Sequence, residues 1–285
     1  MLYSCVRAEY YFAGKFANII IRCAVLFCRV AAVTSALQAA DEPQNLLQRI
    51  RSQMAAHFSQ LPNYTCHQVT DRLLRHGYTG SLERVDSVDL EVAFVKNKEL
   101  FSRPGDSRFE EREIHNFVSG GTIGNGAFGG HVNTVFSSDG ATFTFVGTSK
   151  KDGHKTFRYE FSVPQEKSHF LVRHASAQGI VGYKGSFWVD AETLDLVRFE
   201  LKADHIASYI GVSTIEESMR YTFMRIQNSS FLLPKESQLA VIDQSGNYSL
   251  NMIRLERCRE FTGESVVTYG APDKGASTDH EPSEQ

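Results

Sequence analysis

The glycine-rich stretch GGTIGNGAFGG, residues 120–130, comes closest to a ligand-binding motif. Gly124, Gly126 and Gly129 have the spacing of the dinucleotide fingerprint, in which amide groups at the start of a helix face a pyrophosphate. The segment that follows, HVNTVFSSDG, is short, rich in β-branched residues and ended by Gly140, so we expect no helix there. No Lys-Ser or Lys-Thr pair follows, as a phosphate loop would require. We expect a loop over one end of a sheet, or a lid on a cavity mouth, and no nucleotide site.

The histidines and acidic residues form no catalytic or metal-binding pattern. His169 and His174 are five residues apart on one expected strand, so their side chains point to opposite faces and do not share a metal ion. The sequence has neither an HExxH nor a GxSxG motif. Asp190 and Glu192 lie in an expected turn, where carboxylates ordinarily stabilise the turn itself. We therefore expect no catalytic residue, no metal and no cofactor.

The N-terminus has the pattern of an export signal. Residues 16–33 are apolar apart from Asn18, Arg22 and Arg29, follow basic residues and precede the small residues TSALQAA. The order basic, apolar, small is typical of a secretory signal peptide, which we predict at 1–39. The alternative, a permanent membrane anchor, is disfavoured because an arginine costs roughly 2.5 to 3.5 kcal/mol at the bilayer centre. We expect export to the periplasm or outer envelope of a bacterium.

Two cysteines, Cys66 and Cys258, remain once that segment is removed, one near each end of the mature chain. In an oxidising compartment, an even number of cysteines suggests a disulfide. Such a bond would tie the first strand to the last, and the chain-entropy model gives roughly 5 kcal/mol for so long a loop. The alternative is two buried free thiols.

One amphipathic helix and a long series of strands must position these residues. Residues 42–61 have apolar side chains at helical spacing, with Asp41 as N-cap and Pro62 as the stop signal. From residue 63 the apolar period changes to two, which is typical of antiparallel strands with one solvated face. We expect strands at 63–74, 88–94, 142–147, 157–163, 169–174, 183–189, 194–201, 221–227, 238–243 and 248–258.

About ten strands with short turns and a single helix predict a mainly β fold with an N-terminal helix, in which a curved antiparallel sheet forms a half-barrel. We assign residues 40–268 to this one domain and residues 269–285 to a disordered tail. The chain of 285 residues is 42% hydrophobic and 22% charged, as in globular proteins. Its net charge of -3 and pI near 6.4 offer no positive field for nucleic acid.

Three strings in the sequence resemble known proteins. LPNYTC at 61–66, with FLLPKESQL at 231–239 and CREFTGES at 258–265, resembles a group of secreted bacterial proteins that have an LPxYTC opening and a FLLP segment but no assigned function. The hairpin GYKGSFWVDAETLDLVRFEL at 182–201 is similar to that of periplasmic lipoprotein carriers, the LolA-like superfamily. This second resemblance implies a half-barrel whose concave apolar face binds acyl chains or a lipidated segment, or, in sensor relatives, a partner protein.

These observations together predict a non-enzymatic exported binding protein that holds a lipid, an acyl chain or a lipoprotein segment in the concave face. The expected cavity residues are apolar side chains of the alternating strands and the only Trp, although the apolar ones could equally form a packed core. They are Leu90, Val92, Phe94, Phe157, Tyr159, Phe161, Phe187, Val189 and Trp188. The alternative function is a protein-interaction or envelope-sensing module, whose contact with an envelope protein would be an exposed sheet edge or the glycine loop.

Overall fold

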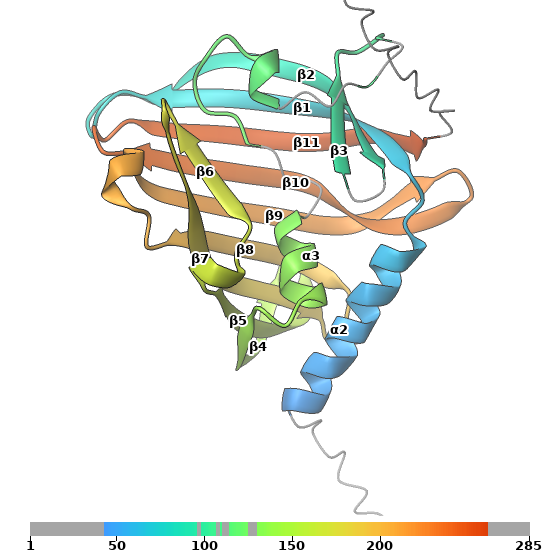
Figure 1. Ribbon diagram of the computed structural model, residues 1–285. Helices are drawn as coiled ribbons and strands as arrows, with labels where there is room; N and C mark the ends of the chain where they lie inside the picture. Colours follow the sequence, from blue (N-terminus) through green and yellow to red (C-terminus); the bar gives the residue numbers. More distant parts are fainter. Residues whose placement is uncertain (1–42, 96–97, 107–108, 110–113, 125–129, 262–285) are drawn as a thin grey trace, which may run out of the picture. The chain divides into compact units, whose positions relative to one another are not determined.

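The computed structural model describes residues 43–95, 98–106, 109, 114–124 and 130–261 (Figure 1). The predicted signal peptide, the predicted tail and both predicted domain boundaries lie outside the described residues. Residues 1–46 and 47–285 form separate compact units, and the sheet and its covering elements belong to the second. Among the described residues, no helix combines the length and the apolar character needed to cross a membrane.

The predicted N-terminal helix is confirmed as α2 (Pro43–Gln60). Its Ile50 and Met54 side chains are fully buried, and Pro62 follows soon after its end. A second helix, α3, spans Gly130–Ser137. The strands are β1 (Tyr64–Arg75), β2 (Glu83–Val95), β3 (Lys98–Ser102), β4 (Thr142–Lys151), β5 (His154–Val163), β6 (Phe170–His174), β7 (Ala177–Asp190), β8 (Leu196–Asp204), β9 (Val212–Ile226), β10 (Ser229–Asp243) and β11 (Tyr248–Glu260). Short 3-10 helices occupy Ile114–Phe117, Gln165–Lys167 and Ser208–Ile210.

The strands form one 11-stranded sheet in the order β3-β2-β1-β11-β10-β9-β8-β7-β5-β4, with β6 paired to the first part of β7. Every described pairing is antiparallel. The end strands β3 and β4 are not partners in the described sheet, which is therefore open rather than closed into a barrel. The predicted fold class, a curved antiparallel sheet with an N-terminal helix, is confirmed.

Alternation along each strand gives this sheet two chemically different faces. Phe187 of β7 lies opposite Tyr159 of β5 and Phe199 of β8, whereas the next residue, Trp188, lies opposite Arg158 and Arg198. We call the face of Phe187 the inner face and the face of Trp188 the outer face. The part of α2 from residue 47, α3 and β6 all lie over the inner face (Figure 1). The sheet therefore buries one face under helices and exposes the other.

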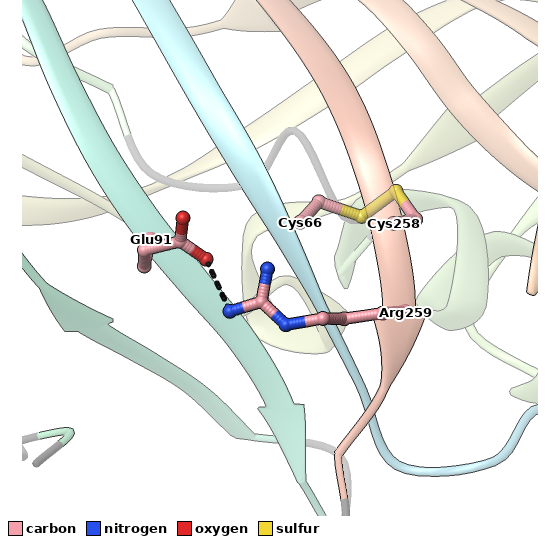
Figure 2. The surroundings of a disulfide bond; sticks show 4 residues. All are labelled: Cys66, Glu91, Cys258 and Arg259. Carbon is pink, nitrogen blue, oxygen red and sulfur yellow. Dashed lines mark hydrogen bonds and ion pairs between the residues drawn. A yellow bond between two sulfur atoms is a disulfide. The ribbon is translucent and has the colours of Figure 1, made fainter. Parts of the chain in front are cut away.

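A disulfide joins Cys66 of β1 to Cys258 of β11, with 4.1 Å between the Cα atoms, which confirms the predicted link between the first and last strands (Figure 2). The two strands are neighbours in the sheet although the cysteines are 192 residues apart. Beside the disulfide, Nη2 of Arg259 lies 3.1 Å from Oε2 of Glu91, which ties β11 across β1 to β2. The disulfide closes a chain loop between residues that are 192 positions apart. In the chain-entropy model, a cross-link restricts the unfolded chain more when the loop that it closes is longer.

The prediction that no helix follows the glycines was wrong, because α3 begins at Gly130. Its β-branched residues disfavour a helix, but Val132, Val135 and Phe136 are three and four residues apart and are all buried. Tertiary packing thus overrides a weak local propensity. The element described before the glycines is the 3-10 helix Ile114–Phe117, so the described residues do not form the strand, loop and helix of a dinucleotide site.

Candidate functional site

Aromatic side chains form a continuous layer on the inner face of β5, β7 and β8. The rings of Tyr159 and Phe187 stack with centroids 5.3 Å apart, and those of Phe161 and Phe199 stack at 4.9 Å. All four side chains are buried. We call these four residues the aromatic layer. Rings from neighbouring strands pack closely here because directly opposite residues share one face of the sheet.

Helix α3 covers this aromatic layer. The ring of Phe136 meets Phe187 edge to face, with centroids 4.9 Å apart. At the C-terminal end of α3, Arg51 of α2 donates hydrogen bonds of 3.0 Å to the backbone carbonyls of Phe136 and Ser138. These carbonyls are among those that a helix end leaves without a partner inside the helix. A helix of eight residues is too short to be stable alone, so the position of α3 depends on these contacts.

The structure divides the predicted cavity residues among three places. Phe157, Tyr159, Phe161, Phe187 and Val189 come together on the inner face of β5 and β7, as aligned by the pairing of the two strands. Leu90, Val92 and Phe94 belong instead to a cluster around the disulfide, at the β1 and β2 end of the sheet. Trp188 lies on the outer face, so it shares no surface with Phe187.

Between these two apolar regions lies a polar centre, which we define as Glu217 of β9, Ser237 of β10 and Asn251 of β11. Glu217 and Asn251 both lie directly opposite Leu239 of β10, and Ser237 is two residues away from Leu239 on the same face. Their exposed fractions are 7%, 3% and 1% for Glu217, Ser237 and Asn251. Burying three polar side chains in an apolar layer costs stability unless each finds a hydrogen-bond partner.

The two titratable groups of this region are both shifted toward their neutral forms. Burial raises the pKa of Glu217 to about 8, the nearby carboxylate of Glu99 adds to this, and the neighbouring Ser237 hydroxyl opposes it. His131 at the start of α3 places its Nε2 3.8 Å from Oε2 of Glu217. Burial lowers the pKa of His131 to about 4. At neutral pH an uncharged imidazole therefore faces a protonated carboxyl group.

Arg72 of β1 fixes the described part of the glycine-rich stretch over the sheet. Its Nε and Nη2 donate to the two carboxylate oxygens of Asp86 at 2.7 and 2.5 Å, which holds the pKa of Asp86 below its usual value. Its Nη1 donates to the carbonyl of Gly120 at 2.6 Å. Further along, a Cβ on Gly124 would lie only 2.4 Å from Cδ2 of Leu239. Gly124 therefore packs directly against the Leu239 side chain, which would have to shift to admit a larger residue.

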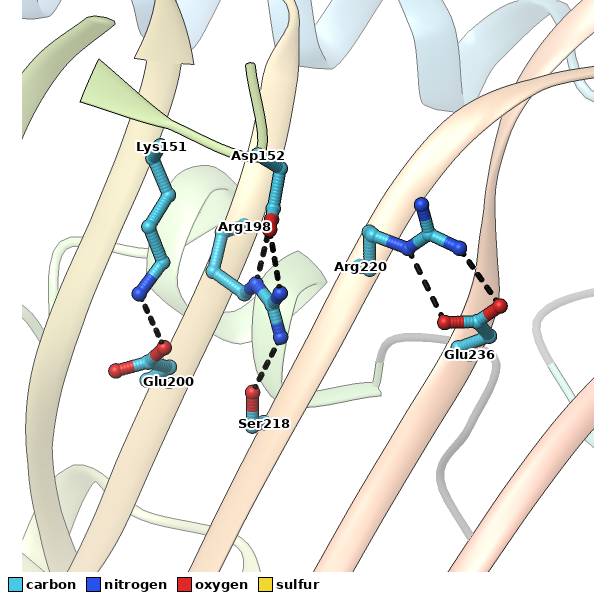
Figure 3. Close-up of polar contacts among 7 residues, drawn as sticks. All are labelled: Lys151, Asp152, Arg198, Glu200, Ser218, Arg220 and Glu236. Carbon is cyan, nitrogen blue, oxygen red and sulfur yellow. Dashed lines mark hydrogen bonds and ion pairs between the residues drawn. The ribbon is translucent and has the colours of Figure 1, made fainter. Parts of the chain in front are cut away.

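On the outer face, charged side chains pair between neighbouring strands. Figure 3 shows Lys151 with Glu200 at 2.8 Å, and Arg220 with Glu236 at 2.6 Å. In the same view, Arg198 reaches both Asp152 and Ser218. The amino group of Lys151 also lies 4.1 Å from the centre of the Trp188 ring. Trp188 thus packs under cations in an ion-pair network.

A groove of about 680 Å³ crosses this outer face. Its two lysines are both paired, Lys184 with Asp204 at 3.0 Å and Lys202 with Glu216 at 2.8 Å. Exposed pairs of this kind leave little net charge to attract an ionic ligand. Across the described residues, no group of three or more His, Cys, Asp or Glu side chains is arranged to hold a metal ion. The inner face is therefore the better candidate site.

No protein-family model matches the chain, and no curated protein matches it. Solved structures with a similar fold include a DUF1329 family protein from Desulfovibrio piger, at 11% identity and TM-score 0.40, covering 77% of this chain and 95% of that chain. A LolA superfamily protein from Nitrosomonas europaea matches at 10% identity and TM-score 0.35, covering 76% and 94% of the two chains. At such TM-scores the likeness says nothing about the ligand, partner or activity of this chain.

Sequence reasoning missed the polar centre, Arg51 and His131. A signal for the centre exists in the sequence, because Glu217 alternates with Ile215 and Met219, and Asn251 with Ile253, as inner-face residues. A polar residue in an apolar register marks a buried polar group. For Glu217 that signal could not be read, because the segment before residue 221 had no predicted strand, whereas Asn251 lies in the predicted strand 248–258 and its signal was missed.

Proposed function

We propose that this chain is an exported, non-enzymatic binding protein that holds the acyl chain of a lipid or of a lipidated protein against the inner face of its sheet. The observation that carries the proposal is the way in which the aromatic layer is covered. The layer spans three strands, and α3, the helix described on it, has only eight residues. The disulfide supports export, because such bonds persist in oxidising compartments.

In this proposal an acyl chain takes the place of α3. Helix α3 contacts the layer through the ring of Phe136, and its other buried side chains, Val132 and Val135, are apolar as well. A flexible hydrocarbon chain offers the same kind of contact, at about 0.8 kcal/mol per buried methylene group. The cost of displacing α3 includes the two hydrogen bonds from Arg51, each contributing about 0.5 to 1.5 kcal/mol. Uncovering Val132, Val135 and Phe136 costs about a further 1.5 to 3 kcal/mol for each side chain, so a chain of about 15 carbons or more is needed to offset the whole cost.

The first test is native mass spectrometry of the mature chain produced with export. A non-covalent adduct that is lost on denaturation, and whose mass matches an acyl lipid, is the expected result. A chain that carries no adduct and that also fails to bind an added fluorescent acyl probe would contradict the proposal.

A variant of Arg51 tests the displacement of α3 directly. Arg51→Leu removes the two hydrogen bonds to α3, so the fluorescent acyl probe should bind about tenfold more tightly than to the wild type. Arg49→Leu makes the same change on α2 and serves as the matched control, with no change in affinity expected. Equal affinities for the wild type and Arg51→Leu would show that α3 does not move when the probe binds.

A second candidate function is protein interaction or envelope sensing, which is favoured by the edge strand β4. Among the described strands, β4 pairs with β5 only, and side chains along its ten residues alternate between half-buried and exposed. An open edge of this length can accept a strand from another protein. Val146→Lys on β4 should then abolish capture of an envelope protein, whereas Val85→Lys on β2, an equally exposed valine, should not.

A further inference from the structure

Several buried polar atoms of the described residues have no hydrogen-bond partner, and Asn251 is the residue that contributes two of them. It is 1% exposed and lies at the middle of the inner face, opposite Leu239 of β10 and Arg72 of β1. Within the described part of the chain, neither its Oδ1 nor its Nδ2 has a hydrogen-bond partner. A side-chain amide has two donors and two acceptor positions, and a buried one is normally paired. An unpaired amide that points into a covered face is typical of a ligand contact.

Glu217 and Ser237 lie next to Asn251 around the same residue, Leu239. Together the three side chains present carboxyl, hydroxyl and amide groups within one small area of an otherwise apolar face. From the opposite side, His131 of α3 faces Glu217 at 3.8 Å, whereas Gly124 of the glycine-rich stretch lies against Leu239. Displacement of α3 would therefore uncover the aromatic layer and the Glu217 side of the polar centre together.

The charges around the polar centre decide which chemical group it can take. Arg72, directly opposite Asn251, already gives all of its guanidinium nitrogens to Asp86 and to backbone carbonyls of the glycine-rich stretch. His131 belongs to α3 and leaves with that helix when an acyl chain takes its place. Neither group offers a positive charge to a carboxylate or phosphate, and a buried anion without a partner is strongly unfavourable. The group that fits is polar and uncharged.

We propose that Glu217, Ser237 and Asn251 form a subsite for the uncharged ester or amide linkage at the head of an acyl chain. This inference rests on the proposed function, because the hydrocarbon tail would lie on the aromatic layer in the place of α3. The amide of Asn251 donates from Nδ2 to the linkage carbonyl and accepts at Oδ1 from a neighbouring hydroxyl or amide N–H. The protonated carboxyl group of Glu217 is a second donor for the same carbonyl.

The test compares two probes with the same hydrocarbon tail, oleate and 1-oleoylglycerol, in competition against a fluorescent acyl probe on the full mature chain. The ester should bind about tenfold more tightly than the anion, because a site built to hydrogen-bond a group discriminates against ligands that lack it. Asn251→Leu should remove about tenfold of the ester affinity and leave that of oleate unchanged. Gln238→Leu, which removes a side-chain amide from the outer face of β10, is the matched control.

The outcomes separate this inference from the proposed function. If both probes bind with equal affinity and Asn251→Leu changes neither, the subsite is refuted while acyl binding stands. If neither probe nor the fluorescent reporter binds the wild type, both proposals fail. Ser237→Ala removes only a hydroxyl group and should also lower the affinity for the ester. If neither Ser237→Ala nor Asn251→Leu changes the affinity for the ester, the subsite is refuted. Dioleoylglycerol and a diacylated lipopeptide then distinguish a free lipid from a lipidated protein as the source of the linkage.

Discussion

His57 of α2 and Asp195, in the turn between β7 and β8, form a close pair in which Nε2 lies 2.6 Å from Oδ1. The side chains are only 17% and 14% exposed. Gln53, one turn earlier on α2, donates to the same carboxylate oxygen at 3.1 Å. The pair holds the helix that carries Arg51 against the central hairpin. Arg51, whose hydrogen bonds hold α3 over the aromatic layer, is therefore kept in position by a carboxylate in a hairpin turn.

Asp195→Asn should lower the free energy of unfolding at pH 7 by about 1 to 2 kcal/mol, because it removes the charge from a hydrogen-bonded, largely buried pair. Burial alone would raise the pKa of Asp195, but hydrogen bonds hold that pKa below 3.8, and they come from Thr193, Gln53 and His57. A depressed carboxyl pKa stabilises the fold above the unfolded value, and that contribution is lost as pH falls through the folded value.

Urea unfolding at pH 7 and near pH 3 measures this contribution. The gap between Asp195→Asn and the wild type should narrow as the pH is lowered below 3.8. Glu192→Gln, a change in the same turn, is the control and should unfold like the wild type at both pH values. A gap that stays constant with pH would mean that the pair acts through shape and not through charge.

The helix, the two faces of β7 and the disulfide were predictable because each leaves a local pattern. The helical spacing of Ile50 and Met54 and the alternation of Phe187 with Trp188 are visible within one element. The pairing of Cys66 with Cys258 followed from the predicted export signal, because removal of residues 1–39 leaves these two cysteines in an oxidising compartment. Helix α3 was missed because its stability comes from Phe136 on Phe187, a contact between distant segments. Local propensity contains no information about such contacts.

The polar centre was beyond prediction for a related reason. Glu217, Ser237 and Asn251 belong to three strands, and only the order β9, β10, β11 and the register of those strands bring them around Leu239. A shift of one residue in any strand would place its polar side chain on the outer face, where polar side chains are expected because that face is exposed. Sequence periodicity gives the face of a residue within one strand but not its neighbour on the next.

Replacing both Cys66 and Cys258 by alanine should lower the free energy of unfolding by about 2 to 5 kcal/mol, since the disulfide closes a long loop. The measurement is guanidinium unfolding with and without a reductant. The wild type should lose the same stability when it is reduced, and the double variant should be insensitive to the reductant. A wild type that unfolds identically in both conditions would show that the sheet does not depend on this bond.

Glu217 should make the protein less stable as the pH rises from 6.5 to about 8. Its folded pKa is raised to about 8 from 4.5, so in this range the folded chain keeps a proton that the unfolded chain has lost. Stability therefore falls with increasing pH, by about 1 to 2 kcal/mol over this window. His131 opposes this decline only slightly, because its folded pKa of about 4 keeps it neutral in the folded chain while the unfolded chain, with the ordinary pKa of 6.5, loses its remaining His131 protons early in this window; the effect is about 0.4 kcal/mol.

Glu217→Gln tests this directly, because glutamine has the shape of the protonated acid and does not titrate. Its free energy of unfolding should stay level between pH 6.5 and 8, while that of the wild type declines. Glu216→Gln, the neighbouring residue on the outer face, should retain the decline of the wild type. A decline of equal size in Glu217→Gln would assign the pH dependence to another group.

Asn251→Leu should raise the thermal unfolding midpoint even though we expect it to weaken ester binding. The substitution exchanges an unpaired buried amide for an apolar side chain of similar size, which removes a cost of about 1 to 3 kcal/mol. For a domain of this size, that gain corresponds to a rise of roughly 2 to 12 °C. Functional sites are where proteins give up stability of this kind. Differential scanning calorimetry of Asn251→Leu and of Gln238→Leu measures the difference. A fall in the midpoint of Asn251→Leu would mean that the amide already has a structural partner, and the case for a ligand contact at Asn251 would be lost.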